Sequence, residues 1–531
     1  MLAALAVTLW AHAAPHSAMT LHVPEPVARG SAPLVGVPAP GQTMELSISL
    51  PLRNEDELRS LVRVITSPAS PEYRHYLSVA EFTARYGPSF ADYRSLVRWA
   101  VEHNLHPHPF PANRRILDVQ STVSDVERAF HVRIGIYRHP SEGRTFYAPD
   151  REPSLDLAQP VLHISGLDDY AQPVSHLVRG EVPEGTAKKP TGSGPDGNFI
   201  GSDIRAAYYG GTALTGTGQS LGLFEFAGYN LADVRRYFQK VGQLNDVPIV
   251  GVSLNGANLE CKDKCNDGEQ ALDMEEALSM APGLKQLVVY VGHYQEAILN
   301  QMASDDTSAQ LSCSWGWGPD AAELDPIFEE FAAQGQSFLV ATGDDGYLLK
   351  QGVVWPADDQ LATAVGGTDL TTNGPGGAWL GETGWYYSGG GPSPDGIPIP
   401  DFQKPFVTAQ NKGSRELRNV PDIAGDAQVD NYSCFVGGCY TGNGGTSYAA
   451  PLWAGFIALA NQFAAASGKP SIGFLNTPIY AIGGTNGYEA AFHDEIKGYN
   501  GRYAAGPGFD LVTGFGSPNG EATIKALVRG R

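Results

Sequence analysis

Histidine is scarce in the C-terminal two-thirds of this chain. Of 13 histidines in 531 residues, only His293 and His493 follow residue 180. A nucleophilic serine needs a neighbouring base, which is most often histidine. A serine nucleophile in this part of the chain would therefore be expected to depend on a carboxylate.

Basic residues are also scarce relative to acidic ones. The chain has 36 Lys and Arg against 57 Asp and Glu, and residues 1–190 carry a net charge of −2 while the remainder carries −19. No basic patch or stripe appears, so we expect no nucleic-acid partner. The uneven charge and the length of 531 residues together indicate two folded units.

Long apolar runs are absent after the N-terminus, so we expect no membrane partner. The opening MLAALAVTLWAHAAP is apolar and ends in small residues, which predicts a signal peptide over residues 1–14. A signal peptide predicts that the protein is secreted, and transit through a periplasm is compatible with this prediction. A plain N-terminal tail remains the alternative, because no basic residue precedes the apolar stretch.

Only five cysteines are present. Cys261 and Cys265, and likewise Cys434 and Cys439, are close pairs that could form local disulfides in an oxidising compartment. Cys313 is then left over in the apolar run LSCSW, where we expect a buried thiol.

The patterning divides the chain into three stretches. Residues 24–177 mix amphipathic helical and strand patterns, which predicts a compact α+β domain. Residues 178–198 have the Gly, Pro, Ser and Lys content of an exposed linker, where a processing site is expected. In residues 199–531, short apolar strands alternate with helices, which predicts an α/β domain with a parallel sheet flanked by helices.

Ser447 is the candidate nucleophile. It lies in GGTSYAAP, where a glycine-rich turn leads into a long apolar helix. Amides at a helix N-terminus stabilise negative charge, which suits an attacking alkoxide or the oxyanion that follows. The alternative is a serine that caps a buried helix.

Glu269 and Asp273 are the candidate base and its partner. They are four residues apart in the predicted helix GEQALDMEEALSM, and therefore share one face. Two close carboxylates can share a proton, so that one pKa rises. The alternative is a solvated acidic face, to which Glu275 and Glu276 would also belong.

Asp344 is the third candidate acid. In FLVATGDDGY it follows an apolar strand and enters a glycine turn, where active-site loops lie in parallel sheets. A protonated Asp344 could donate a hydrogen bond to an oxyanion. An ordinary turn aspartate is the alternative, and Asp345 competes for the role.

Asp494 and Asp510 flank a glycine-rich segment near the C-terminus. Calcium prefers carboxylate and carbonyl oxygens, and glycine lets a backbone curl around an ion. The spacing does not match an EF-hand, so an ordinary polar loop remains the alternative.

Together these segments resemble the sedolisin family of serine-carboxyl peptidases. SPEYRHYLSVAEFTARYGP is similar to the family's N-terminal activation domain. The core motifs follow in the family's order over nearly the whole chain: ExxLDxE, SWG, ATGDDG, WPA…AVGGT, VPDIAGDA, GGTSYAAP and AGPGFDLVTGFGSP.

The resemblance implies a fold and a set of roles. The fold would be a subtilisin-like α/β peptidase domain over 199–531, preceded by a ferredoxin-like prodomain. Ser447 would be the nucleophile and Glu269 its base, with Asp273 orienting Glu269 and Asp344 stabilising the oxyanion. The substrate cleft would be lined by Ser314, Trp315 and Gly316. One calcium ion would be held by Asp494 and Asp510 and by the carbonyls of Glu495, Gly506 and Gly508.

The resemblance also implies a function. We expect a secreted, acid-active endopeptidase, made as a monomeric zymogen that acts on peptides and is inhibited by its own prodomain. A tripeptidyl exopeptidase of the same family, and a non-catalytic calcium-stabilised binding protein on this scaffold, are the alternatives. Asp345 departs from the family's usual GDSG, and could either raise the pKa of Asp344 or face solvent.

Overall fold

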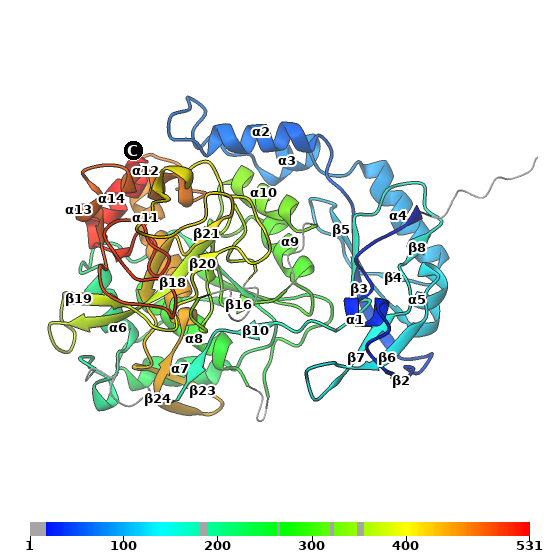
Figure 1. Ribbon diagram of the computed structural model, residues 1–531, viewed down its shortest axis with the longest axis horizontal. Coiled ribbons are helices and arrows are strands. Elements are labelled where there is room, and N and C mark those ends of the chain that lie inside the picture. The colour runs from blue at the N-terminus through cyan, green and yellow to red at the C-terminus, as the bar shows by residue number, and fades with distance from the viewer. Residues whose placement is uncertain (1–16, 181–189, 263–265, 319–322, 348–354, 531) are drawn as a thin grey trace, which may run out of the picture. The chain divides into compact units, whose positions relative to one another are not determined.

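A computed structural model describes residues 17–180, 190–262, 266–318, 323–347 and 355–530 (Figure 1). The predicted signal peptide and residues 181–189 of the predicted linker lie outside these residues. Internal contacts divide the described chain into two units. The first comprises 17–52, 87–110 and 114–170, and the second comprises 53–86, 111–113 and the described residues from 171 onward.

The first unit is built on an antiparallel sheet of four strands in the order β4-β5-β3-β9. A second, three-stranded sheet has the order β2-β6-β7. The elements of this unit are β1 (Ser17–Ala18), α1 (Glu25–Ala28), β2 (Leu34–Gly36), β3 (Thr43–Ser49), α4 (Phe90–Glu102), β4 (His106–Pro107), β5 (Ile116–Thr122), α5 (Val123–Phe130), β6 (Ile134–Arg138), β7 (Thr145–Pro149), β8 (Ser154–Leu155) and β9 (His163–Ser165).

The core of the first unit follows directly from its sequence pattern. Leu46 and Ile48 alternate along β3 and are fully buried, and they share one cluster with Leu96 of α4 and Phe130 of α5. Side chains at alternate strand positions point to the same face, so β3 presents one apolar face to the two helices. The predicted α+β domain is confirmed in this unit.

The second unit is built on an eight-stranded sheet. Its order is β13-β14-β12-β15-β17-β18-β19, with β22 also paired to β18. All pairs are parallel except that between β18 and β19. The strands are β12 (Ser220–Glu225), β13 (Ile249–Ser253), β14 (Gln286–Val291), β15 (Gln310–Cys313), β17 (Ser337–Ala341), β18 (Thr363–Thr372), β19 (Trp379–Gly384) and β22 (Ile423–Asp426).

Helices and short strands complete the second unit, and the predicted α/β fold is confirmed. The helices are α2 (Glu55–Ile65), α3 (Val79–Arg85), α6 (Gly201–Tyr208), α7 (Leu231–Lys240), α8 (Gly268–Met280), α9 (Gln295–Asp305), α10 (Asp325–Gln334), α11 (Thr446–Ala466), α12 (Asn476–Gly483), α13 (Tyr488–Ala491) and α14 (Gly520–Arg529). The short strands are β10 (Val174–Ser175), β11 (Val178–Arg179), β16 (Trp315–Gly316), β20 (Gly391–Pro392), β21 (Asn419–Val420), β23 (Asn431–Phe435), β24 (Gly438–Gly444), β25 (Phe492–His493) and β26 (Ser517–Pro518).

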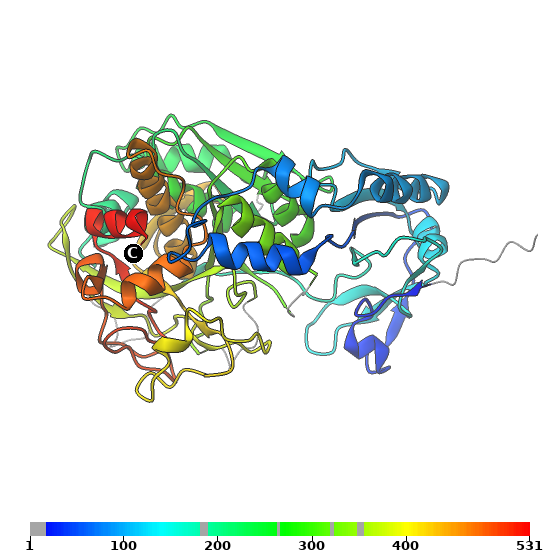
Figure 2. The same cartoon turned by 90° about the horizontal axis from the view of Figure 1, so that it is seen from above.

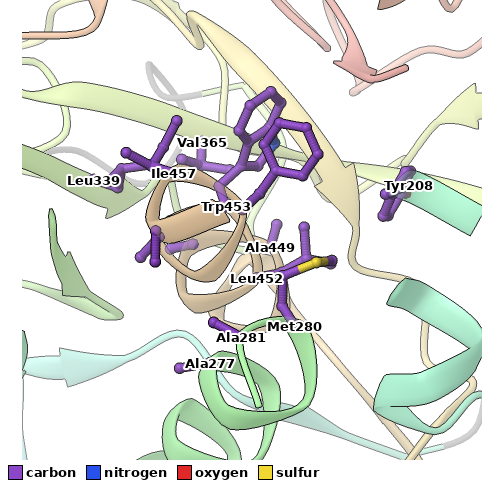
Figure 3. Close-up of a cluster of buried hydrophobic side chains, with 14 of the residues drawn as sticks. Tyr208, Ala277, Met280, Ala281, Leu339, Val365, Ala449, Leu452, Trp453 and Ile457 are labelled. Carbon is purple, nitrogen blue, oxygen red and sulfur yellow. The ribbon is translucent and has the colours of Figure 1, made fainter. Parts of the chain in front are cut away.

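Helices α8 and α11 approach each other closely in the main core. Figure 3 shows Leu452 of α11 near Met280 and Ala277 of α8, whereas Trp453 of α11 points away from α8. A Cβ added at Gly455 would lie 2.8 Å from Met280 Cβ, so only glycine permits this spacing. The close packing fixes the two helices that carry Ser447 and Glu269.

Helix α11 corrects one sequence expectation. Its 21 residues, with a mean hydropathy of 1.2, are long and apolar enough to span a membrane, although no such stretch was expected. However, 78% of its apolar window is buried inside the protein. A helix that is apolar on all sides is also what the core of a large soluble domain requires.

Residues 53–86 belong to the second unit, although the sequence groups them with the prodomain. Figure 2 shows α2 lying along the helices of this unit, and α2 contacts α10. Arg59 Nε donates to Glu329 Oε1 at 3.1 Å, and Arg74 donates to the carbonyls of Leu527 and Val528. Contacts do not locate processing sites, so the boundaries predicted from sequence remain predictions.

Candidate active site

Helix α8 brings two carboxylates into the interior. All 13 of its residues are buried, with Glu269 only 3% exposed and Asp273 fully buried. Glu275 and Glu276 are buried as well. The alternative of a solvated acidic face is therefore wrong, because α8 lies between β12, α7 and α11.

Glu269 lies beside the candidate nucleophile. Burial raises its pKa to about 7, and the hydroxyls of Ser175 and Ser447 act in the opposite direction. The Ser175 hydroxyl donates to Glu269 Oε2 at 2.5 Å. Ser447, in the first turn of α11, has a buried Oγ without a conventional hydrogen bond among the described residues. The structure thus brings the predicted nucleophile and base together.

Asp273 belongs to a wider carboxyl cluster that includes Glu225. Ser314 Oγ donates to Asp273 Oδ1 at 2.7 Å, and Trp315 Nε1 donates to Glu225 Oε2 at 3.0 Å. Burial raises the pKa of Asp273 well above its usual value, reinforced by the charges of Glu225 and Glu269. Glu225 was not predicted from sequence. The available signal was an acid at the carboxyl end of the buried strand SLGLFE.

Asp344 lies just after β17, facing the start of α11. Its Oδ1 accepts from the Thr446 amide at 2.7 Å and from Thr446 Oγ1 at 2.9 Å, while its buried Oδ2 has no partner among the described residues. Burial raises its pKa well above the usual range, and the charges of Glu269 and Asp345 contribute. Asp345 itself is exposed, so it faces solvent and still favours the protonated form of Asp344.

Residues 174–179 run past these groups as a substrate would. On one side β10 pairs antiparallel with β16, with Val174 opposite Gly316, and the His176 amide donates to the Ser314 carbonyl at 3.2 Å. The predicted cleft residues Ser314, Trp315 and Gly316 thus lie along this segment. On the other side β11 pairs antiparallel with β24.

The peptide bond between His176 and Leu177 lies at the centre of the cluster. A Cβ added at Gly445 would lie 2.1 Å from the His176 carbonyl oxygen and 2.6 Å from Asp344 Oδ2, so these two oxygens are close neighbours. The Leu177 amide donates to Ser175 Oγ at 3.3 Å and also stabilises the Glu269 carboxylate. The carbonyl therefore faces Asp344, and the amide faces Glu269.

Several known proteins are similar in sequence to this chain over most of its length. The chain is 30% identical to kumamolisin of Bacillus sp. (strain MN-32) over 518 residues, covering 91% of this chain and 92% of that protein. This chain belongs to the sedolisin family of serine-carboxyl peptidases. The sequence-family model for the pro-kumamolisin activation domain matches residues 32–170 of this sedolisin-family chain.

Two further relatives and one solved structure are also similar to this sedolisin-family chain. It is 28% identical to sedolisin of Pseudomonas sp. (strain 101) over 99% of this chain and 93% of that protein. Tripeptidyl-peptidase 1 of Rattus norvegicus is 26% identical over 96% of each chain. The structure of Pseudomonas sedolisin, a serine-carboxyl proteinase complexed with pseudo-iodotyrostatin, aligns with a TM-score of 0.54 and 25% identity, covering 64% of this chain and 98% of that chain. The chain is therefore a serine-type peptidase with a zymogen activation domain.

The residues predicted to bind calcium lie in two facing segments. Asp494 Oδ2 accepts from the Gly508 amide at 2.9 Å, and Asp510 Oδ2 accepts from the Gly506 amide at 2.8 Å. Asp510 is 2% exposed, and burial raises its pKa to about 7. A cation would offset the cost of burying this carboxylate, so the donor set fits a hard metal ion.

Side chains alone do not make a metal site here. Within the described residues, no group of three His, Cys, Asp or Glu side chains is arranged to hold a metal. The Glu495 carboxylate is buried, where it accepts from Ser517 Oγ at 3.1 Å. Any contribution of Glu495 would therefore come from its carbonyl, as the family resemblance implies.

The cysteines form one disulfide within the described residues, between Cys434 and Cys439, which confirms one of the two suggested pairs. Cys313 is free and buried, as expected. Cys265 lies outside the described residues, so its pairing with Cys261 remains a prediction.

Proposed function

We propose that this protein is a secreted, acid-active endopeptidase that is made as a self-processing zymogen and first cleaves its own His176–Leu177 bond. The observation that supports this is the path of residues 174–179 through the cleft. The bond lies just before residues 178–198, where the sequence predicts processing, so the proposal moves that predicted site upstream. N-terminal sequencing of protein acidified stepwise from pH 7 to pH 4 tests it. A new N-terminus at Leu177 is expected, and an intact chain after prolonged acidification would refute the proposal.

The reaction is acyl transfer to Ser447. Its Oγ attacks the carbonyl carbon of His176 while Glu269 takes the hydroxyl proton. Asp344 Oδ2–H donates to the oxyanion, since this acid is held protonated by its surroundings. Glu269 then returns the proton to the Leu177 nitrogen as the peptide bond breaks, and water hydrolyses the acyl-enzyme through the same base.

The relative pKa values favour these roles. Burial raises the pKa of Glu269 to about 7, and it raises the pKa values of Asp273, Asp344 and Glu225 well above their usual range. Interacting carboxyls titrate as a coupled set, so an ionised Glu269 can coexist with a protonated Asp344. Once residues 174–179 leave, water reaches Glu269 and its pKa falls toward the acid range.

Activity should consequently be highest at acid pH. The mechanism requires an ionised Glu269 and a protonated Asp344, which gives a bell-shaped profile of kcat/KM. The test is the pH profile of the processed enzyme on a peptide substrate. A maximum near pH 8 would contradict the roles assigned to both carboxyls.

Endopeptidase activity is favoured over tripeptidyl activity by the continuity of the chain. Val174, which pairs with Gly316, is the third residue before the bond, and the chain continues upstream through Pro173 and Gln172. A tripeptidyl peptidase would need a free amine at that position. Cleavage of N-acetylated peptides separates the two, and activity restricted to peptides with a free N-terminus would favour the exopeptidase.

Secretion and calcium binding complete the proposal. The Cys434–Cys439 disulfide is consistent with an oxidising compartment. Fractionation of cells that express the full chain tests secretion, and retention in the cytoplasm would contradict it. For calcium, EGTA should lower the Tm of the Ser447→Ala protein, and Asp510→Asn should abolish that difference. An unchanged Tm would argue against a bound ion.

A further inference from the structure

The residues that follow the His176–Leu177 bond lie against the hairpin formed by β23 and β24. Val178 is opposite Gly444 and Arg179 opposite Asn443 in the antiparallel pairing of β11 with β24. The hairpin is closed by the Cys434–Cys439 disulfide. The residues that follow the scissile bond therefore pair with the edge of a strand that a disulfide holds in place.

The hairpin also holds the Arg179 side chain. The guanidinium carbon lies 3.9 Å from the centroid of the Phe435 ring, and Nη2 donates to Asn266 Oδ1 at 3.2 Å. Phe435 is fully buried beneath this contact and stacks on Tyr440 with ring centroids 4.9 Å apart. An aromatic face attracts a cation through its quadrupole, most strongly when little water intervenes.

Two carboxylates lie at the turn that follows Phe435, one of them, Asp233, also paired with Arg236. Asp267 Oδ1 accepts from the Val436 amide at 2.8 Å, and Asp233 Oδ2 accepts from the Gly437 amide at 3.0 Å, so two carboxylates hold the hairpin turn. The charge of Arg179 also reaches Glu269, where it favours the ionised form of the base. Negative charge on this side of the cleft disfavours an acidic substrate side chain and favours a basic one.

We propose that Phe435, Asn266 and the edge of β24 form a subsite that selects a cationic side chain, above all arginine, at the third residue after the scissile bond. The inference rests on the proposed function, because it takes His176–Leu177 as the bond cleaved. It extends that function from a position of cleavage to a class of substrate, namely peptides with a basic residue in the third position of the leaving fragment.

The test compares peptides on enzyme obtained by acidifying the full chain. One internally quenched peptide carries residues 171–182, and two others differ only in citrulline or Gln at the position of Arg179. Citrulline keeps the shape and most hydrogen-bond donors of arginine but not its charge. We expect kcat/KM for the Arg peptide to exceed the other two by about fivefold, as a cation–π contact of ~1 kcal/mol predicts.

Variants connect the preference to the ring. In Phe435→Leu the ratio of Arg to citrulline cleavage should fall close to one, whereas Phe435→Tyr should keep it. Tyr386→Leu, which removes an exposed aromatic ring elsewhere, is the matched control and should also keep the ratio. Since each enzyme is compared with itself on the three peptides, a general loss of activity does not affect the result.

The outcomes distinguish the two levels of the proposal. Equal cleavage of the Arg, citrulline and Gln peptides by the wild-type enzyme would overturn the subsite and leave the peptidase intact. An Arg preference that survives in Phe435→Leu would also overturn the subsite. If Phe435→Leu does not fold, Asn266→Ala serves in its place, and an unchanged ratio there would count against the subsite. Cleavage of none of the peptides would overturn the proposed function.

Discussion

Glu276 should make the peptidase unit less stable at neutral pH than at acid pH. Its side chain lies on α8, three residues beyond Asp273 and 3% exposed. Burial raises its pKa to about 8, and the neighbouring charge of Asp426 adds to the effect. The substitution Glu276→Gln keeps the shape of the side chain and removes its titration.

The direction of the effect follows from proton linkage. In the unfolded chain Glu276 ionises near its ordinary pKa of 4.5, whereas the folded protein keeps the proton until about pH 8. Between these values the unfolded state binds fewer protons, so stability falls as pH rises. The difference amounts to about 5 kcal/mol above pH 8 and about 3 kcal/mol at pH 7.

The assay is thermal unfolding between pH 5 and 8 in a Ser447→Ala background, which prevents self-cleavage. At roughly 2 °C per kcal/mol for a large domain, Glu276→Gln should retain ~5–10 °C of Tm that its parent loses by pH 8. The exposed Glu416→Gln is the matched control and should follow the parent. Parallel loss of Tm in Glu276→Gln and its parent would refute the reasoning, because the buried carboxyl would then not be a source of the pH dependence.

Three further substitutions test the site and the packing of residues 53–86. Glu269→Gln should lower kcat for peptide cleavage by about 10²–10⁴-fold because the base is lost. The control Glu416→Gln should leave kcat unchanged, and similar rates for the two variants would contradict a role of Glu269 as the base. Gly316→Ala should slow self-processing about tenfold, because the added Cβ would lie 2.7 Å from His176 Nε2. A second substitution, His176→Gly, should restore the rate, which is followed on gels over time. Failure of that rescue would show that the two residues do not meet during cleavage. Arg74→Ala should cost about 2 kcal/mol of unfolding free energy in the Ser447→Ala protein, because the carbonyls of Leu527 and Val528 lose their donors. The exposed Arg98→Ala is its control in denaturant titration, and equal midpoints for both would contradict the anchoring role.

Much of the secondary structure was determined by local pattern. The apolar runs SLGLFEF, KQLVVYVG, AQLSCSW and QSFLVATG became β12, β14, β15 and β17 of the parallel sheet. The predicted helix GEQALDMEEALSM became α8 with the same bounds, Gly268–Met280. Such elements are readable because periodicity and turn residues act over a few positions.

The sequence also pointed to Ser447, Glu269 and Asp344, because motifs and the shortage of histidine narrow the choice of chemistry without any coordinates. It left open whether α8 is solvated, since acidic residues are usually exposed and a helical pattern does not reveal its neighbours. Tertiary packing decided this by placing α8 beneath α11, which converts ordinary carboxyls into proton-sharing ones.

Only the tertiary structure revealed Glu225 and the course of residues 174–179 through the cleft. Glu225 at the end of β12 meets Asp273 of α8 and Trp315 of β16, and His176 meets Gly445 across more than 250 residues. Contacts of this kind arise from the closing of the sheet and the packing of its helices, and no local pattern encodes them. The sequence by itself determined which groups could react, and the fold decided which of them are buried together and which peptide bond lies between them.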